Sequence, residues 1–346
     1  MAAAGWVRSL DPTRPGAFRF WLALLVFAYH CSSFGVGHFS VAVFFVLSGY
    51  WVQRMWQARY ARCVGPYRTY LISRVWRLAP VMLLVSLIAV AEMAALGRLA
   101  DLRADSPLQL AVSSVVLIGY SALPVQPLVP AWSLDIEARY YVMAPALAAV
   151  AAMIRPALLL AFCAALSLVW TLVAPDAVGL LRYLGFFVTG LSAASSGLRI
   201  PRAVARGSAA GILVVLLAAI VIARGVVFGG AHPGPEYRWN ETLNMALAVI
   251  AVPFALATVH RPSDAADRML ADMSYIIYLL HWPAIQPLGL VAGTFLHRLP
   301  FAALTWGMTL ATSWAIWRWF DRPINARRAR WVAARAAIGT GAVAVS

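Results

Sequence analysis

Long apolar runs, separated by short segments that hold most of the charges, dominate the sequence. An apolar run of about 16–20 residues or more is long enough to cross the hydrocarbon core of a bilayer as a helix. Eleven runs reach or approach this length, near residues 17–34, 39–56, 77–97, 107–122, 134–153, 157–174, 178–196, 209–228, 241–260, 272–295 and 300–320. The pattern therefore predicts an all-α fold, a polytopic transmembrane helical bundle.

Arginines in the short loops indicate how these runs are oriented, because positive charges collect on the cytosolic side. The segment 54–77 is the most basic and should be cytosolic, together with the N-terminus. The basic segments 199–206, 261–268 and 322–330 can be cytosolic as well only if one run does not cross. The run 107–122 is short and flanked by prolines, so we expect it to be re-entrant or interfacial at the outer side. About ten crossings remain, with both termini cytosolic.

The composition leaves no room for a large soluble domain. Of 346 residues, 62% are hydrophobic and only 12% are charged, whereas soluble domains carry about 25% charged residues. We expect a single integral-membrane domain over residues 1–330 and a cytosolic tail over 331–346. The formal net charge of +15 comes from arginines that flank apolar runs, so we expect no nucleic-acid partner. No spacing typical of a metal site is evident, and we expect no metal.

A histidine lies near the middle of the first run. His30 follows Arg19 by eleven residues, which is about three helical turns, so both lie on one helix face roughly 16 Å apart. Ionisable groups inside a bilayer usually face a bundle interior or a wet cavity. His30 is therefore either a core histidine bonded to a neighbouring helix or a functional group.

Two arginines mark the cytosolic end of the third run. Arg74 and Arg77 are three residues apart and share a helix face. Arginine binds phosphate in a fork geometry, so the pair could hold a nucleotide, although simple topogenic charge is the commoner reason for two arginines at this spacing. In the second run, the neighbours Ser48 and Gly49 favour close helix packing.

The segment Trp132–Tyr141 brings a carboxylate into the membrane from the predicted outer side. Asp135 and Arg139 are four residues apart and can form a local pair. Glu137 points elsewhere and is a candidate acid, base or hydrogen-bond acceptor. Alternatively, Ser133 and the acidic residues after it are an ordinary helix start.

A second histidine within an apolar run follows a stripe of polar residues. Ser274, Tyr278 and His281 lie at spacings of four and three residues and therefore share a helix face. Pro283 removes a backbone hydrogen bond beside His281. A histidine next to such a helix break is a candidate functional group.

Taken in order, these segments resemble the acyltransferase-3 family of integral-membrane acyltransferases. The matching segments are Arg19 to His30, Phe44 to Gly49, Arg74 with Arg77 and Pro80, Trp132 to Glu137, Arg182 with Phe186 and Gly190, Ser274 to Pro283, and Asp321 to Pro323. Two positions depart from the family pattern: Ala42 replaces an acidic residue, and Asp321 replaces a glutamate. The resemblance spans residues 19–323, nearly the whole chain.

The resemblance implies a membrane O-acyltransferase that uses a cytosolic acyl-coenzyme A, with acetyl-coenzyme A as the expected donor. The acceptor is expected to be a hydroxyl of a glycan, an exported polysaccharide or a glycosylated metabolite. We expect a location in a bacterial cytoplasmic membrane, in contact with membrane lipid.

The same resemblance assigns roles to the candidate residues. Arg74 and Arg77 would hold the coenzyme A phosphates. His30 would act as general base, with an acyl-histidine relay as an open alternative. Arg19 and Glu137 complete the expected catalytic group. The expected substrate-binding residues are Trp132, Arg182, Ser274, Tyr278 and His281.

Two other classes of function remain open from the sequence. A transporter or flippase for a glycolipid or acylated metabolite would also use buried polar residues. A scaffold would use them only to join helices. The Arg19–His30 and Arg74–Arg77 motifs together distinguish an acyltransferase from a transporter, because a transporter needs no coenzyme A anchor at the cytosolic end.

Overall fold

The computed structural model describes residues 10–104, 106–173, 179–229, 235–287 and 295–343. Every regular element in these ranges is a helix, and no strand occurs in them. The all-α prediction is therefore confirmed, whereas the number of crossings and the side on which each terminus lies stay predictions.

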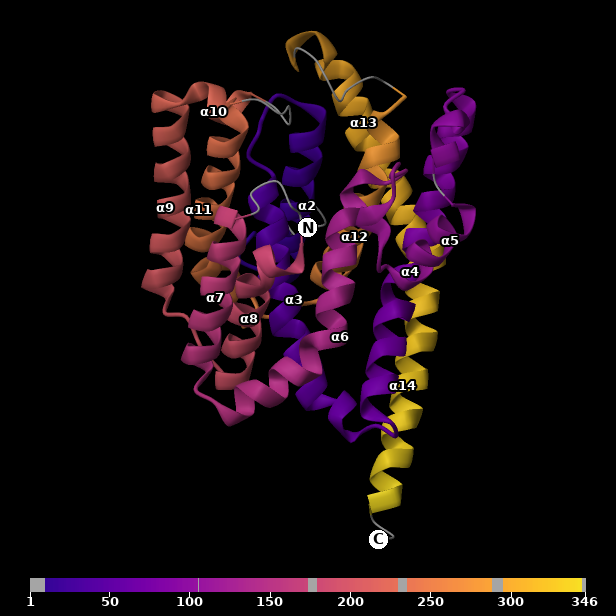
Figure 1. The fold of residues 1–346 in the computed structure, drawn as a ribbon, viewed down its shortest axis with the longest axis vertical. Helices are drawn as coiled ribbons and strands as arrows, with labels where there is room; N and C mark the ends of the chain where they lie inside the picture. The colour runs from indigo at the N-terminus through magenta and orange to yellow at the C-terminus, as the bar shows by residue number, and fades with distance from the viewer. Residues whose placement is uncertain (1–9, 105, 174–178, 230–234, 288–294, 344–346) are drawn as a thin grey trace, which may run out of the picture. The chain divides into compact units, whose positions relative to one another are not determined.

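The helices follow the apolar runs in order along the chain (Figure 1). The α-helices are α2 Pro15–Cys31, α3 His38–Ala58, α4 Pro66–Ala95, α5 Pro107–Val116, α6 Trp132–Met153, α7 Pro156–Val173, α8 Leu180–Ser196, α9 Arg202–Ile222, α10 Arg224–Phe228, α11 Pro235–Thr258, α12 Ala265–Ile285, α13 Phe295–Ile316 and α14 Arg322–Val343. The short 3-10 helices include η1, Tyr60–Arg62. A π-helical turn, Trp317–Asp321, joins α13 to α14.

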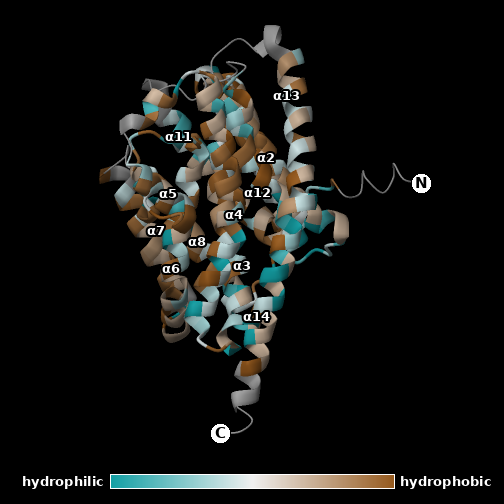
Figure 2. Ribbon diagram, turned by 90° about the vertical axis from the view of Figure 1, so that its right-hand side faces the viewer, coloured by the Kyte–Doolittle hydropathy of each residue, from teal (hydrophilic) through white to brown (hydrophobic). Residues whose placement is uncertain are grey.

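Two basic segments expected outside the helices are helical. The start of α4 is Pro66 rather than residue 77, because proline suits the first helical position and Gly65 before it adopts a positive φ of 55°. A search for apolar runs finds only the later, hydrophobic part of this helix. The expected C-terminal tail contains most of α14, whose many arginines make it the most hydrophilic of the long helices (Figure 2).

Within the described residues, three helical segments are long and apolar enough to cross a membrane: α4, α9 and Trp239–Thr258 within α11. Pro107–Val116 and Ala157–Trp170 are shorter apolar helices. Large apolar side chains of α9, such as Leu213, Leu217 and Val221, are exposed. Exposed apolar surface of this extent fits contact with lipid. The protein is thus an all-helical chain with apolar helices suited to a membrane.

The chain divides into two compact units, residues 1–44 with 199–317 and residues 45–198 with 318–346. In the first unit, α2 packs against α12, α12 against α13, and α9 against α11. In the second unit, α8 packs against α6 and α7, while α4 packs against α5 and α14. Each unit has its own hydrophobic cluster, centred on α2 with α12 and on α7 with α8.

Glycines permit the closest helix contacts within the second unit. A Cβ added at Gly49 would overlap the backbone of Phe187, and one added at Gly190 would overlap the carbonyl oxygen of Val46. The neighbours Ser48 and Gly49 therefore lie at a close helix approach, as the small-residue pair predicts.

Candidate active site

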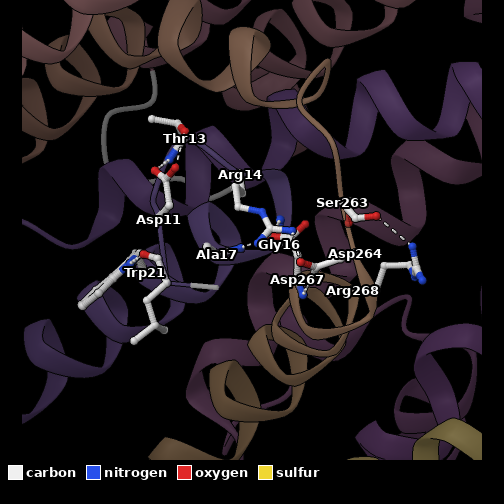
Figure 3. A network of polar contacts seen from close by, with 11 residues as sticks. Asp11, Thr13, Arg14, Gly16, Ala17, Trp21, Ser263, Asp264, Asp267 and Arg268 are labelled. Carbon is white, nitrogen blue, oxygen red and sulfur yellow. Dashed lines mark hydrogen bonds and ion pairs between the residues drawn. The ribbon is translucent and has the colours of Figure 1, made fainter. Parts of the chain in front are cut away.

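A buried carboxylate of α12 caps the N-terminus of α2 (Figure 3). Asp267 is fully buried, and its Oδ1 accepts hydrogen bonds from the backbone N–H groups of Gly16, at 3.0 Å, and Ala17, at 2.9 Å. The first N–H groups of a helix have no partner within the helix, and they favour a negative charge. Gly16 has no side chain to obstruct this contact, since a Cβ there would overlap the backbone of Asp267.

Arg14 completes this cap from the residue before the helix. Its Nη2 lies 2.7 Å from Asp264 Oδ2, and its Nε lies 4.0 Å from Asp267 Oδ1. Asp264 is itself the N-cap of α12, accepting a hydrogen bond from the backbone N–H of Asp267 at 2.9 Å. This hydrogen bond and the nearby Arg14 lower the pKa of the exposed Asp264.

The cap sets the register in which α2 and α12 run side by side. Gly16 and His30 are fourteen residues apart, and so are Asp267 and His281. Fourteen helical residues span about 21 Å, so a contact at the first pair places the second pair side by side when the helices are parallel. The rings of His30 and His281 are indeed stacked, with centroids 5.2 Å apart and an interplanar angle of 26°.

The two histidines differ in exposure. His281 is fully buried, and its Nδ1 lies 3.2 Å from the carbonyl oxygen of Ile277. A hydrogen on Nδ1 satisfies this contact and leaves Nε2 as the acceptor; within the described part of the chain, Nε2 has no partner. His30 is only partly buried, and the edge of Trp282 approaches it at 5.3 Å between ring centroids.

The other predicted residues of this unit lie on the same two helices. Tyr278 and Ser274 are buried on α12 together with His281. The Tyr278 ring lies 6.2 Å from His281, whereas Ser274 Oγ donates to the carbonyl oxygen of Ala271 at 2.8 Å. Arg19 is partly buried on α2.

A further histidine lies near His30 without having been marked by the sequence patterns. The ring of Tyr29 is 4.8 Å from His30 and 4.7 Å from His38. His38 Nδ1 lies 2.6 Å from Glu241 Oε1, and both side chains are mostly buried. The histidine and the glutamate are 203 residues apart, so no local pattern could pair them.

In the second unit, Arg74 lies among tyrosines. Its Nη2 donates to Tyr60 OH at 2.9 Å, and its guanidinium carbon lies 5.5 Å from the Tyr60 ring centroid. The rings of Tyr70 and Tyr141 are each 5.9 Å away. These distances are typical of cation–π contacts. Burial raises the pKa of Tyr60, but the Arg74 charge and hydrogen bonds from Ser73 and Arg74 outweigh it, and the net pKa is lowered.

Arg77 forms an ion pair instead. Its Nη1 lies 3.4 Å from Oδ2 of the buried Asp321. Asp321 also accepts a hydrogen bond from Asn325 Nδ2 at 2.7 Å. The two arginines predicted to share a helix face therefore have different partners, tyrosines for Arg74 and a carboxylate for Arg77.

Glu137 accepts two hydroxyl hydrogen bonds. Ser48 Oγ and Tyr141 OH both donate to its Oε1, the second at 2.6 Å. The predicted pair of Asp135 with Arg139 is present at 2.7 Å. Asp135 is fully buried and also accepts the backbone N–H groups of the 119–121 loop.

Two predicted substrate residues, Trp132 at the start of α6 and Arg182 at the start of α8, both contact the ring of Tyr183. The Trp132 and Tyr183 rings have centroids 5.8 Å apart, and the Arg182 guanidinium carbon is 5.9 Å from the Tyr183 ring. Arg182 is buried. The predicted site residues thus form two groups: Arg19, His30, Ser274, Tyr278 and His281 in the first unit, and Arg74, Arg77, Trp132, Glu137 and Arg182 in the second.

These features define a helical membrane protein with buried acid–base groups and a basic, tyrosine-lined cluster. The profile of the acyltransferase-3 family, described as an acyltransferase domain, matches residues 13–318. The chain therefore belongs to this family, and the family implies acyltransferase activity. Comparisons with curated proteins and with solved structures gave no match. The findings give no support to the transporter alternative.

Proposed function

We propose that the protein transfers a short acyl group, expected to be acetyl, from acyl-coenzyme A to a hydroxyl group. The acceptor hydroxyl belongs to a glycan, an exported polysaccharide or a glycosylated metabolite. The observation that carries the proposal is the stacked pair of His30 and His281, which places two imidazoles together in an apolar helix pair of an acyltransferase.

His30 is the general base of the proposed reaction. Its imidazole takes the proton of the acceptor hydroxyl, the oxygen attacks the acyl carbonyl carbon, and the carbon–sulfur bond breaks. The imidazolium then returns the proton to the coenzyme A thiolate, so no proton is gained or lost overall. An imidazole suits both steps because its ordinary pKa lies near neutrality.

The other predicted residues bind or position the two substrates. His281 stacks on His30 and, with Tyr278, positions the acceptor. Arg19 compensates the charge of the donor. Glu137, whose carboxylate accepts hydrogen bonds from Ser48 and Tyr141, orients the acceptor hydroxyl. Trp132, Arg182 and Ser274 are the remaining proposed acceptor-binding residues.

Arg74 and Arg77 bind the donor phosphates in this proposal. Both lie in the N-terminal half of α4, the half that the arginine distribution predicts to be toward the cytosol. Guanidinium groups hold phosphate oxygens in pairs. A metal is not required by the proposed steps.

The test is release of coenzyme A from acetyl-coenzyme A by purified protein, with membrane glycolipid extract as the source of acceptors. We expect His30→Ala to lower the rate by about 100-fold or more, the usual contribution of a general base. His260→Ala is the matched control, because His260 is exposed at the end of α11, and it should keep the wild-type rate. A wild-type rate in His30→Ala would contradict the assignment of the base, and a wild-type protein that binds no coenzyme A would contradict the donor.

A further inference from the structure

One arginine outside the predicted site residues joins the basic cluster of the second unit. Arg328 lies on α14, which packs against α4 and η1. Its Nη1 donates to Ser73 Oγ at 2.9 Å, and its Nε donates to Asn325 Oδ1 at 3.1 Å. These two hydrogen bonds connect Arg328 to Arg74 and Arg77 of α4.

The connection to Arg74 runs through two hydroxyl groups. Ser73 Oγ and Tyr60 OH are 2.7 Å apart, and Arg74 Nη2 donates to Tyr60 OH at 2.9 Å. Each hydroxyl therefore accepts from one guanidinium and contacts the other hydroxyl. The arrangement holds Arg74 and Arg328 on either side of one hydroxyl pair.

The connection to Arg77 runs through Asn325 and Asp321. Asn325 accepts from Arg328, while its Nδ2 donates to Asp321 Oδ1 at 2.7 Å. Asp321 Oδ2 then pairs with Arg77 Nη1 at 3.4 Å. Three guanidinium groups and one carboxylate thus share a single network, which leaves a net charge of +2.

The network has more hydrogen-bond donors than acceptors. The hydroxyls of Ser73 and Tyr60 carry two hydrogens, and only one of these can lie between the two oxygens, so the other is left to donate elsewhere. Arg74 Nε is buried without a partner in the described ranges. Among the described residues, neither Arg74 nor Arg328 forms an ion pair with a carboxylate.

The positive charges of the cluster are also only partly compensated, by the carboxylate of Asp321. Burial, followed by the positive charges of Arg74 and Arg77, lowers the pKa of Arg328 to about 10. The side chain nevertheless keeps its charge at neutral pH, so three like charges stay close together. An anion with several acceptor oxygens would satisfy the spare donors and offset this repulsion, and a phosphate group has both properties.

We propose that Arg328 is a third phosphate-binding arginine, which together with Arg74 and Arg77 binds a phosphate group of the donor coenzyme A. This inference rests on the proposed function, because it assigns part of the same donor. It also adds a helix to the site: α14 begins at Arg322, beyond the residues 13–318 that match the family profile. The donor site of this chain therefore includes a segment outside that match.

The experiment is calorimetric titration of purified protein in phosphatidylcholine nanodiscs with coenzyme A, 3′-dephospho-coenzyme A and pantetheine. We expect Arg328→Gln to weaken coenzyme A binding by about 10- to 100-fold, as for the loss of a charged hydrogen-bond partner. Binding of pantetheine, which lacks the nucleotide, should stay unchanged. If Arg328→Gln also weakens dephospho-coenzyme A, the diphosphate is the group bound; if only coenzyme A is affected, it is the 3′-phosphate.

Two variants serve as controls. Arg327→Gln removes the same charge from the neighbouring exposed position of α14 and should bind coenzyme A like the wild type. Arg328→Lys keeps the charge but loses the fork geometry, and it should give an intermediate affinity. A variant that binds pantetheine with wild-type affinity has a correctly folded donor site. Weaker coenzyme A binding in such a variant therefore reflects the loss of the phosphate contact and not unfolding.

Four results would overturn the inference. Wild-type affinity of Arg328→Gln for coenzyme A contradicts it while leaving the proposed function intact, and equal losses for coenzyme A and pantetheine indicate a structural role only. If the substitution instead lowers retention of phosphatidylglycerol in mixed nanodiscs and leaves coenzyme A binding unchanged, the phosphate belongs to a lipid headgroup. A wild-type protein that binds no coenzyme A contradicts both the inference and the proposed function.

Discussion

Replacing Asp267 by alanine is expected to loosen the pairing of α2 with α12 and to separate the two stacked histidines. Asp267 is fully buried, and its Oδ1 accepts the N–H groups of Gly16 and Ala17 at 3.0 and 2.9 Å. Both residues that donate are buried as well. Water therefore cannot readily replace the carboxylate when it is removed, and two buried N–H groups lose their acceptor.

The size of the effect follows from these two hydrogen bonds. A hydrogen bond to a charged group contributes about 1.5–3 kcal/mol, and an unsatisfied buried donor costs about as much. Removing a buried carboxylate also removes its own desolvation cost, which offsets part of the loss. We expect a net decrease of about 2–5 kcal/mol in the free energy of unfolding, a large share of the stability of a typical domain. Asp267→Asn keeps an acceptor oxygen but loses the charge, and it should cost about 1–2 kcal/mol.

The assay is unfolding by sodium dodecyl sulfate in maltoside micelles, followed by the fluorescence of the 14 tryptophans. Asp264→Ala is the control, since its side chain is 58% exposed and, besides its ion pair with Arg14, caps its own helix. Asp267→Ala should unfold at a clearly lower fraction of dodecyl sulfate than Asp264→Ala. Its enzymatic rate, measured as release of coenzyme A from acetyl-coenzyme A, should also be lower. Equal unfolding midpoints for these two variants would refute the reasoning that the buried carboxylate holds the helix pair.

Two further predictions concern pH and packing. The pKa of Asp264 is lowered by the N–H of Asp267 and by Arg14, so its contribution to stability is present above the unfolded pKa of about 4 and is lost as pH falls through the folded pKa. Melting temperatures measured from pH 6 to pH 3 should therefore fall less in Asp264→Asn than in the wild type, and parallel curves would contradict this. Gly49→Ala should lower stability by about 1–3 kcal/mol, because the added methyl group overlaps the backbone of Phe187. Gly207→Ala, where the added group meets open space, should not lower stability, and an equal loss in both variants would show that close packing is not the cause.

Much of the fold was predictable because helix formation is local. Apolar runs mark the helices, and hydrogen bonds within each run satisfy its backbone whatever the rest of the chain does. The pair of Asp135 with Arg139 was predictable for the same reason, since four residues bring two side chains together on one helix face.

The helix boundaries in basic segments were harder to predict from hydropathy. Residues 66–77 of α4 and the whole of α14 are helical although they carry many arginines. Arginine has a good intrinsic helix propensity, but a search for apolar runs ignores it. Arg328 was missed because the basic segment 322–330 was interpreted only as charge that sets the orientation of the chain.

The sequence by itself determined that this chain is all-helical, has apolar helices suited to a membrane and belongs to the acyltransferase-3 family, and it named the histidines and arginines of the candidate site. Only the tertiary structure decided which of them meet. The cap of Asp267 on Gly16 joins residues 251 positions apart and thereby aligns His30 with His281. The contact of Arg328 with Ser73 likewise joins residues 255 positions apart. Such contacts depend on which helix faces pack together, and local spacing along the chain carries no information about that choice.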